Sequence, residues 1–207
     1  GNPNVTAATT TAAMAVQADH VLRGLEAAAR RIGRSLTVSA ASTPPTPALL
    51  ASLAGDEAAF PGPAAAIRRR SPREPHRRKL LLVAEKLAAT RACLVGEVPG
   101  STGGPGYRDA EGLLADLRLL QGSLAAAGAA RVAYGELQRL AWQAETFGFH
   151  LASLEVRQHA SVHAQALAEL APDAVGDAAA LDRLATGGWP ASSRPRGEVA
   201  EEVLATL

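Results

Sequence analysis

The apolar residues of this chain recur every three or four positions along most of its length, and this helical period is the strongest constraint on its fold. Such spacing lines one face of a helix with apolar side chains, which then need a second surface to cover them. The pattern predicts helices over residues 14–36, 74–94, 109–127, 132–147 and 159–170, short helices over 47–54 and 178–184, and a last helix from Glu198. We therefore expect a mainly α protein.

One stretch, residues 147–158, departs from the helical period and alternates with a period of two, which is typical of a strand. Its sequence is Phe-Gly-Phe-His-Leu-Ala-Ser-Leu-Glu-Val-Arg-Gln. One face of the predicted strand carries Phe149, Leu151, Ser153, Glu155 and Arg157, and the other carries His150, Ala152, Leu154 and Val156. Two interpretations remain open at this point: a half-exposed strand, or a barrel strand whose carboxyl end delivers Arg157 into an active site.

Proline and glycine interrupt the helical pattern in three places, which we interpret as loops. Residues 39–73 and 98–106 are expected to be loop insertions, and residues 173–197 are expected to be mostly loop. The basic run over residues 68–73 could bind an anion, but a solvated surface loop is the simpler interpretation. The glycines of residues 98–106 are not followed by the lysine and Ser/Thr of a phosphate-binding loop, so we expect no nucleotide site there.

Composition excludes several classes of function. The chain has 207 residues, of which 47% are hydrophobic, and its 21 basic and 20 acidic residues leave a net charge of +1. That balance argues against a nucleic-acid or anionic-membrane surface. A single cysteine, Cys93, excludes an internal disulfide. No apolar run is long enough to span a membrane, and we expect a cytoplasmic protein.

The two ends of the sequence suggest a piece of a longer protein. It starts at Gly1 without an initiator methionine, and its last residues read as the interior of a helix. We expect residues 1–207 to be an internal part of a single larger catalytic domain. Abundant alanine and an excess of arginine over lysine suggest a GC-rich bacterial genome.

Four stretches, in order, resemble the phosphoenolpyruvate carboxylase family, and an actinobacterial type is expected. Residues 147–158 followed by His163 are similar to the family pattern F-G-x-x-L-x-x-L-D-[IV]-R-Q-x-S-x-x-H. Residues 1–6, Gly-Asn-Pro-Asn-Val-Thr, resemble the end of G-G-D-R-D-G-N-P-N-V-T. Residues 74–77 resemble E-P-Y-R, and residues 113–124 resemble a family helix that ends in x-S-L.

The resemblance implies a segment of an α-rich (β/α) barrel with one or two strands, from an enzyme roughly four times longer. That enzyme adds bicarbonate to phosphoenolpyruvate, giving oxaloacetate and phosphate, and so feeds the tricarboxylic acid cycle. It uses Mg or Mn and assembles as a homotetramer. The family's T-A-H-P-T-E segment with the catalytic histidine, its metal-binding Glu and Asp and its glycine- and arginine-rich loop have no counterpart in this chain. No catalytic or metal-binding residue is therefore assigned here.

The resemblance assigns one residue a direct role: Arg157, as a substrate-binding residue that holds the phosphate-bearing substrate. A guanidinium is permanently charged and offers a planar fork of donors that suits phosphate oxygens. Glu155 is expected to orient Arg157 through an ion pair. Gln158 is expected to support the site from the other face, and Asn2 to lie near it because the family's arginine–aspartate pair precedes that position.

Three positions depart from the family pattern. Glu155 replaces the usual Asp, His76 replaces Tyr, and Ala160 replaces a Ser that is a helix-capping residue, a role that Ser161 could take. None of these changes removes the proposed substrate-binding group, although the first could shift it. The alternative function is a non-catalytic, soluble helical interaction module that shares the pattern.

Overall fold

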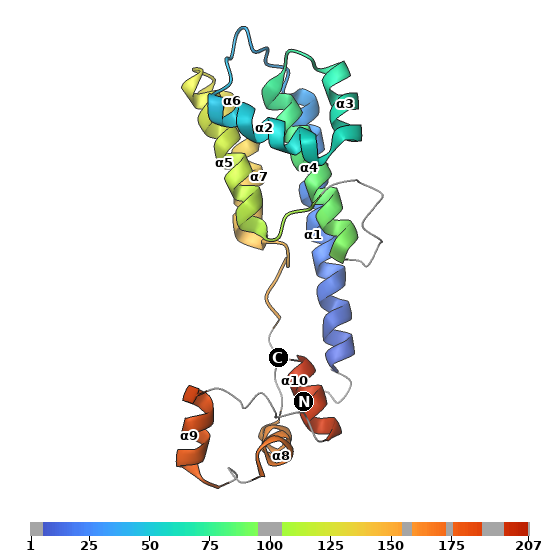
Figure 1. Ribbon diagram of the computed structural model, residues 1–207, viewed down its shortest axis with the longest axis vertical. Helices are drawn as coiled ribbons and strands as arrows, with labels where there is room; N and C mark the ends of the chain where they lie inside the picture. The colour runs from blue at the N-terminus through green and yellow to red at the C-terminus, as the bar shows by residue number, and fades with distance from the viewer. Residues whose placement is uncertain (1–5, 95–104, 155–158, 173–175, 188–196, 207) are drawn as a thin grey trace. The chain divides into compact units, whose positions relative to one another are not determined.

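The computed structural model describes residues 6–94, 105–154, 159–172, 176–187 and 197–206, and every regular element within these ranges is a helix (Figure 1). The helices are α1 Ala7–Ser35, α2 Pro47–Ala59, α3 Pro61–Arg70, α4 Pro75–Leu94, α5 Ala110–Ala126, α6 Ala130–Ala133, α7 Glu136–Phe147, α8 Ala160–Leu170, α9 Ala178–Gly187 and α10 Glu198–Thr206. The prediction of a mainly α protein is confirmed.

The chain divides into two compact units, which are described separately. The larger unit is Ala15–Ala152 and contains most of α1 together with α2 to α7. Within it, α5 contacts α2, α4, α6 and α7, and Figure 1 shows α5 and α7 running side by side. Ion pairs also join α1 to its neighbours: Arg30 Nη1 lies 2.8 Å from Glu85 Oε1 on α4, and Arg31 Nη1 lies 2.7 Å from Glu136 Oε1 on α7.

The core of the larger unit consists of the apolar stripes that the sequence predicts. Its fully buried leucines come from α1, α2, α4, α5 and α7: Leu22, Leu49, Leu80, Leu87, Leu113, Leu117, Leu120, Leu124, Leu137 and Leu140. Each such side chain contributes about 1.5–3 kcal/mol through removal of its apolar surface from water. A smaller apolar cluster lies beside this core, where Phe60 packs with Leu53, Ala64, Leu82 and Ala89.

Polar caps define where two of these helices begin. Thr46 precedes α2, its side-chain oxygen accepts a hydrogen bond from the Leu49 amide at 3.3 Å, and Pro47 occupies the first helical position. Asp109 caps α5 in the same way, accepting from the Gly112 amide at 3.0 Å. These caps satisfy amide groups that have no partner within the helix.

The smaller unit comprises residues 1–14 and 153–207, and its described core is small. Helices α8 and α10 pack together through Ala166, Ala200 and Val203. A side-chain contact adds to this packing, because Glu169 Oε2 on α8 accepts a hydrogen bond from the Ala200 amide at 2.8 Å.

Several predictions need correction. The strand over residues 147–158 is wrong for its described part, because Phe147 ends α7 and residues 148–154 form turns and irregular backbone; residues 155–158 lie outside the described residues. Thus no strand occurs in the part of the chain that the structure describes, and one or two were expected. The loop insertion predicted over residues 39–73 contains a helix that was not expected, since α3 begins at Pro61 and its last turn carries Arg68, Arg69 and Arg70 of the basic run.

Other boundaries follow the sequence more closely. The helix predicted over residues 132–147 is divided at Tyr134 and Gly135 into α6 and α7. The short helix predicted within residues 173–197 is present as α9. Of the loop predicted over residues 98–106, only residues 105 and 106 are described, and they lie outside any helix.

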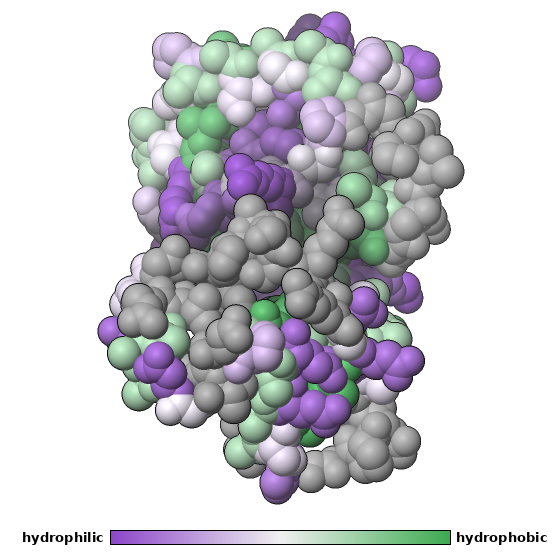
Figure 2. Space-filling view, turned by 60° about the horizontal axis from the view of Figure 1, so that its bottom comes forward, coloured by the Kyte–Doolittle hydropathy of each residue, from purple (hydrophilic) through white to green (hydrophobic). Residues whose placement is uncertain are grey.

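Exposed apolar side chains are scattered over the surface. Hydrophilic and hydrophobic residues are interspersed on the described part of the face that Figure 2 shows. The largest exposed apolar side chains of the larger unit include Tyr134 and Trp142. Among the helices of the described residues, none is both long enough and apolar enough to cross a bilayer.

The two neighbouring leucines of α2 provide a matched test of this core. Leu49 is fully buried, whereas Leu50 is 47% exposed. We expect Leu49→Ala to lower the free energy of unfolding by about 2–5 kcal/mol, because it leaves a cavity. Leu50→Ala should change it by less than about 0.5 kcal/mol. Urea denaturation followed by circular dichroism measures both, and equal effects would contradict this packing.

Candidate functional site

The turn that follows α7 contains the most unusual backbone of the described residues. Gly148 has a φ of 53° and Leu151 a φ of 65°, and Leu151 is the only non-glycine residue with positive φ in the part of the chain that is described. Gly148 combines its φ of 53° with a ψ of −142°, a backbone conformation that is essentially confined to glycine. The left-handed conformation of Leu151 costs of the order of 1–3 kcal/mol, and such strain is concentrated at functional sites.

Backbone hydrogen bonds close this turn. The Leu151 amide donates to the Phe147 carbonyl at 2.9 Å, and the Ala152 amide donates to the His150 carbonyl at 2.7 Å. From α1, the side-chain amide nitrogen of Gln17, when it faces the turn, donates to the carbonyl oxygens of His150 at 3.2 Å and Ala152 at 3.3 Å. The turn is thereby attached to α1 as well as to α7.

Two side chains of the turn attach it to the core. Phe149 and Leu151 are partly buried and pack against the main apolar cluster. The Phe149 ring lies 6.4 Å from the Tyr107 ring, centroid to centroid, with the planes inclined by 49°. This distance lies within the range of favourable aromatic pairs.

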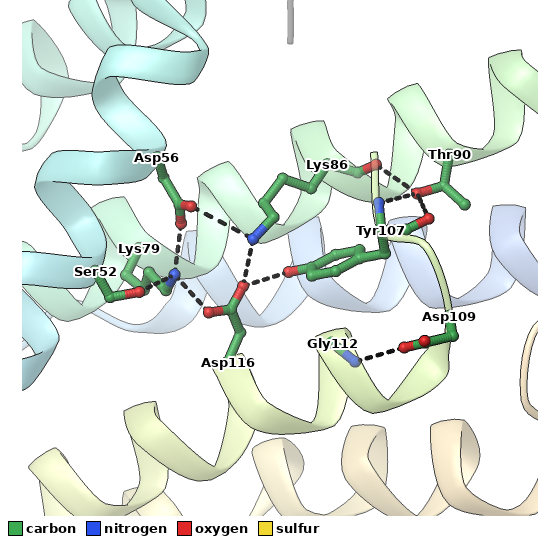
Figure 3. Close-up of polar contacts among 9 residues, drawn as sticks. All are labelled: Ser52, Asp56, Lys79, Lys86, Thr90, Tyr107, Asp109, Gly112 and Asp116. Atoms are coloured by element: carbon green, nitrogen blue, oxygen red, sulfur yellow. Dashed lines mark hydrogen bonds and ion pairs between the residues drawn. The ribbon is translucent and has the colours of Figure 1, made fainter. Parts of the chain in front are cut away.

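Tyr107 contacts a largely buried cluster of four charges, which we call the ion cluster: Asp56 on α2, Lys79 and the partly exposed Lys86 on α4, and Asp116 on α5 (Figure 3). Lys79 Nζ lies 2.5 Å from Asp56 Oδ2 and 2.7 Å from Asp116 Oδ1. Lys86 Nζ lies 2.7 Å from Asp116 Oδ2 and 3.4 Å from Asp56 Oδ1. Two positive and two negative charges therefore balance.

Lys79 is the deepest member of the ion cluster, because its side chain has no exposed surface. Its ammonium group has three protons, and a third acceptor, Ser52 Oγ, lies 2.7 Å from Nζ (Figure 3). Asp56, Asp116 and Ser52 thus satisfy all three donors. This full satisfaction is what makes burial of an ammonium group tolerable.

Tyr107 joins the ion cluster to the turn. Its hydroxyl donates to Asp116 Oδ2 at 2.7 Å, and Lys86 Nζ lies 4.3 Å from the centre of its ring, in position for a cation–π interaction. Burial and the negative charge of Asp116 raise the pKa of Tyr107 well above its ordinary value. The hydroxyl therefore remains protonated and continues to donate.

The backbone of Tyr107 is also held in place, by α4. Its amide donates to Thr90 Oγ1 at 2.7 Å, and that hydroxyl donates to the Lys86 carbonyl at 2.9 Å. The preceding Gly106 packs so closely that a Cβ there would lie 2.6 Å from the Thr90 nitrogen. Residue 106 must therefore be glycine for Tyr107 to reach this position.

The ion cluster supports structure rather than chemistry. Burial alone raises the pKa of Asp116, but the charge of Lys79 and hydrogen bonds from Lys79, Lys86 and Tyr107 outweigh this effect and hold that pKa below its ordinary value. Asp116 is thus a carboxylate at neutral pH, already bonded to two ammonium groups. Among the described residues, no group of three or more His, Cys, Asp or Glu side chains is arranged to hold a metal ion.

The four predicted site residues, Asn2, Glu155, Arg157 and Gln158, all lie outside the described residues. Their predicted roles therefore remain predictions. The described structure does show the turn that ends three residues before Glu155, and the helix that follows the predicted site. That helix, α8, is capped by His159, whose Nδ1 accepts from the Ser161 amide at 3.2 Å, so the capping role suggested for Ser161 is not borne out.

Residues 74–77 and 113–124, two of the stretches that carry the family resemblance, contact each other in the core. His76, at the start of α4, lies with its Nε2 2.8 Å from Ser123 Oγ on α5. Ser123 Oγ also accepts a hydrogen bond from the Thr46 amide at 3.0 Å. Burial lowers the pKa of His76, which favours its neutral form. His76, at the tyrosine position of the family pattern, is thus a packed core residue.

Sequence reasoning missed the residues of the ion cluster and Tyr107. A signal was present, since these charges fall on the apolar faces of their helices. Asp116 is three residues after Leu113 and four before Leu120, and Lys79 is four before Val83. A charge within an apolar stripe indicates a buried partner, although sequence alone does not name that partner.

Comparison with known proteins agrees with the resemblance. A family model described as phosphoenolpyruvate carboxylase matches residues 1–182. The chain is 37% identical over 175 residues to a phosphoenolpyruvate carboxylase of Roseiflexus castenholzii and 38% identical over 183 residues to one of Burkholderia mallei. Each alignment covers 82% of this chain, but only 19% and 17% of the two relatives, so the chain spans less than a fifth of their length.

Two aspartates of the α5 region allow a matched test of the ion cluster. We expect Asp116→Asn to lower the free energy of unfolding at pH 7 by about 3 kcal/mol, because it leaves the buried ammonium group of Lys79 and the partly buried one of Lys86 with a single carboxylate. Asp109→Asn makes the same chemical change at the exposed cap of α5, where Asn serves as well as Asp, and should cost only a few tenths of a kcal/mol. Urea denaturation measures both variants.

The pH dependence of stability gives a second test of the ion cluster, by comparison of the wild type with Asp116→Asn. Since the pKa of Asp116 is lower in the folded state than in the unfolded state, its contribution is fully present above about pH 4 and is lost as the pH falls through the folded pKa. The stability of the wild type should therefore fall more steeply below pH 4 than that of Asp116→Asn. Parallel pH profiles would contradict this account of the ion cluster.

Proposed function

The chain belongs to the phosphoenolpyruvate carboxylase family, and we propose that it is a segment of an enzyme that carboxylates phosphoenolpyruvate with bicarbonate. The products are oxaloacetate and phosphate, so the whole enzyme replenishes the tricarboxylic acid cycle. The family match over residues 1–182 carries this proposal. It favours the enzyme over the alternative of a non-catalytic helical interaction module.

Within this enzyme, Arg157 holds the phosphate-bearing substrate. The reaction transfers the phosphoryl group to a bicarbonate oxygen, giving carboxyphosphate and the enolate of pyruvate, and the enolate carbon then takes up the carboxyl carbon as phosphate leaves. Negative charge surrounds the migrating phosphoryl group throughout. A guanidinium placed there stabilises this charge and fixes the direction of transfer through paired hydrogen bonds.

Three further residues support Arg157 in this proposal. Glu155 orients the guanidinium through an ion pair, Gln158 supports the site from the opposite face, and Asn2 lies near the substrate. Support for these roles comes from their positions in the family pattern, with Glu155 one methylene longer than the usual Asp.

The remaining parts of the active site come from outside this chain. A divalent metal, Mg or Mn, supplies positive charge to the reacting oxygens when bound, and its ligands are the Glu and Asp of the missing downstream region. In this proposal Asp56 and Asp116 take no part in metal binding, since their carboxylates are bonded to Lys79 and Lys86. We further propose that the whole enzyme is a cytoplasmic homotetramer.

Replacement of Arg157 tests the proposed function in the full-length enzyme that contains this segment. We expect Arg157→Ala to lower kcat/KM for phosphoenolpyruvate by about 100-fold or more, because charge-assisted hydrogen bonds to the transferring group are lost. Arg157→Lys should keep part of the activity, since it retains the charge but not the fork. Formation of oxaloacetate, coupled to malate dehydrogenase, provides the assay.

Arg69→Ala is the matched control, because it removes an exposed arginine of α3 by the same chemical change. Its kinetics should equal those of the wild type. Circular dichroism should show that both alanine variants remain folded. Near-normal turnover of a folded Arg157→Ala enzyme would refute the role of Arg157.

The 207-residue chain by itself is expected to form no oxaloacetate, because the catalytic histidine and the metal ligands are elsewhere in the proposed enzyme. The assay adds bicarbonate, phosphoenolpyruvate and Mg²⁺ to the purified chain, with the full-length enzyme as the positive control. Bicarbonate-dependent oxaloacetate formation by the chain alone would show that this division of the active site is wrong.

A further inference from the structure

We propose that His76 is an acid-sensitive switch of the larger unit, which holds the starts of α2 and α4 against α5 while its ring is neutral and releases them when the ring takes up a proton. The proposal goes beyond the proposed function and does not depend on it, because it concerns the packing of described helices and not the reaction.

His76 lies where three helices are joined. It is the second residue of α4, it has no exposed surface, and its Nε2 lies 2.8 Å from Ser123 Oγ on α5. Ser123 Oγ also accepts a hydrogen bond from the amide of Thr46, the residue that caps α2. The contact between the imidazole and the hydroxyl therefore joins the start of α4 to α5 and, through Ser123, to the start of α2.

Only the neutral form of the His76 ring suits this environment. A neutral imidazole has one N–H donor and one acceptor nitrogen, whereas the protonated ring has a donor on each nitrogen. Nε2 has Ser123 Oγ as its partner, but Nδ1 is buried, and no group in the described part of the chain forms a hydrogen bond with it. Protonation would thus leave a charged donor buried without an acceptor, at the full cost of its desolvation.

The carboxylates of the surrounding helices already balance other cations. Each acidic residue of α1 to α7 is ion-paired with a lysine or arginine: Asp19, Glu26, Asp56, Glu57, Glu85, Glu111, Asp116, Glu136 and Glu145. Glu74, two residues before His76, is paired with Arg77 at 3.0 Å. A protonated His76 would therefore have to share a carboxylate that already has a positive partner.

A buried positive charge also lies one helical turn from His76. Lys79 follows it by three residues, a spacing that places both side chains on one face of α4, and both residues are fully buried. The ion cluster is balanced, because Lys79 and Lys86 face Asp56 and Asp116. A proton on His76 would add a third positive charge beside these two negative ones. Repulsion therefore acts in the same direction as burial, which lowers the pKa of His76.

The sign of the pH effect follows from this lowered pKa. When the contact opens, His76 meets water and has the ordinary histidine pKa of about 6.5. Between that pH and the lower pKa of the closed form, opening takes up one proton, so the closed form loses stability as the pH falls. Asp116 contributes to the pH dependence only below about pH 4, so the two effects occupy separate ranges.

The switch is specific to histidine at this position. The tyrosine of the family pattern can also form a hydrogen bond with a serine, but its hydroxyl takes up no proton in mild acid. His76 is the only histidine between residues 21 and 149 of the sequence. A pH response of α2, α4 and α5 near pH 6 can therefore be assigned to one side chain.

The test is hydrogen exchange of the full-length enzyme from about pH 5 to about pH 8, measured by mass spectrometry of peptides from α2, α4 and α5. Correction for the intrinsic exchange rate gives the opening equilibrium constant at each pH. His76→Tyr introduces the family residue, and His76→Gln is a second variant that does not titrate. His20→Tyr is the matched control, because it makes the same change at an exposed histidine of α1.

For the wild type, we expect the opening constant to rise by up to about tenfold for each pH unit below about pH 6.5, since one proton is taken up. Both His76 variants should lose this slope, and His20→Tyr should keep it. The slope does not depend on the level of stability, so a variant that weakens the core remains informative. A wild-type constant that does not change with pH, or the same slope in both His76 variants, would overturn the proposal. Loss of the slope in His20→Tyr would also overturn it.

Discussion

The arrangement of the larger unit depends on the burial of Lys79 between two carboxylates. An ammonium group without exposed surface is stable only when each of its donors has an acceptor, and here Asp56, Asp116 and Ser52 provide them. These acceptors come from α2 and α5, whereas the lysine comes from α4. Apolar packing alone would be compatible with several registers of these three helices. The buried ion pairs therefore help to specify their relative register.

This specification extends to the turn that follows α7. Tyr107 donates a hydrogen bond to Asp116 and packs against Phe149 in the turn. In that turn Leu151 has a left-handed backbone conformation, which a leucine does not adopt without support from its surroundings. Strained backbone of this kind is concentrated at functional sites and persists only where the surrounding packing supports it. In the enzyme that we propose, the turn and the packing that supports it lie within this chain, and the catalytic histidine and the metal ligands lie outside it.

The sequence predicted the helices well. The apolar residues of α1, α4 and α5 keep the helical period over several turns, and this period can be recognised from neighbouring positions alone. The strand predicted from alternation over residues 147–158 is wrong for its described part, residues 147–154. Phe149 and Leu151 do both pack on the core, as alternation implies, but Gly148 ends α7 and the positive φ of Leu151 closes a turn. Side-chain burial with a period of two is thus achieved there without an extended backbone.

The sequence by itself determined the helical class, the family and the expectation that Arg157 binds the substrate, because these depend on periodicity and on motifs that can be read along the chain. Only the tertiary structure decided which charges share a site and what holds the turn before Glu155. Asp56 and Asp116 are 60 positions apart, yet both contact Lys79 Nζ. Such partners are set by the packing of separate helices, and no local pattern contains that information.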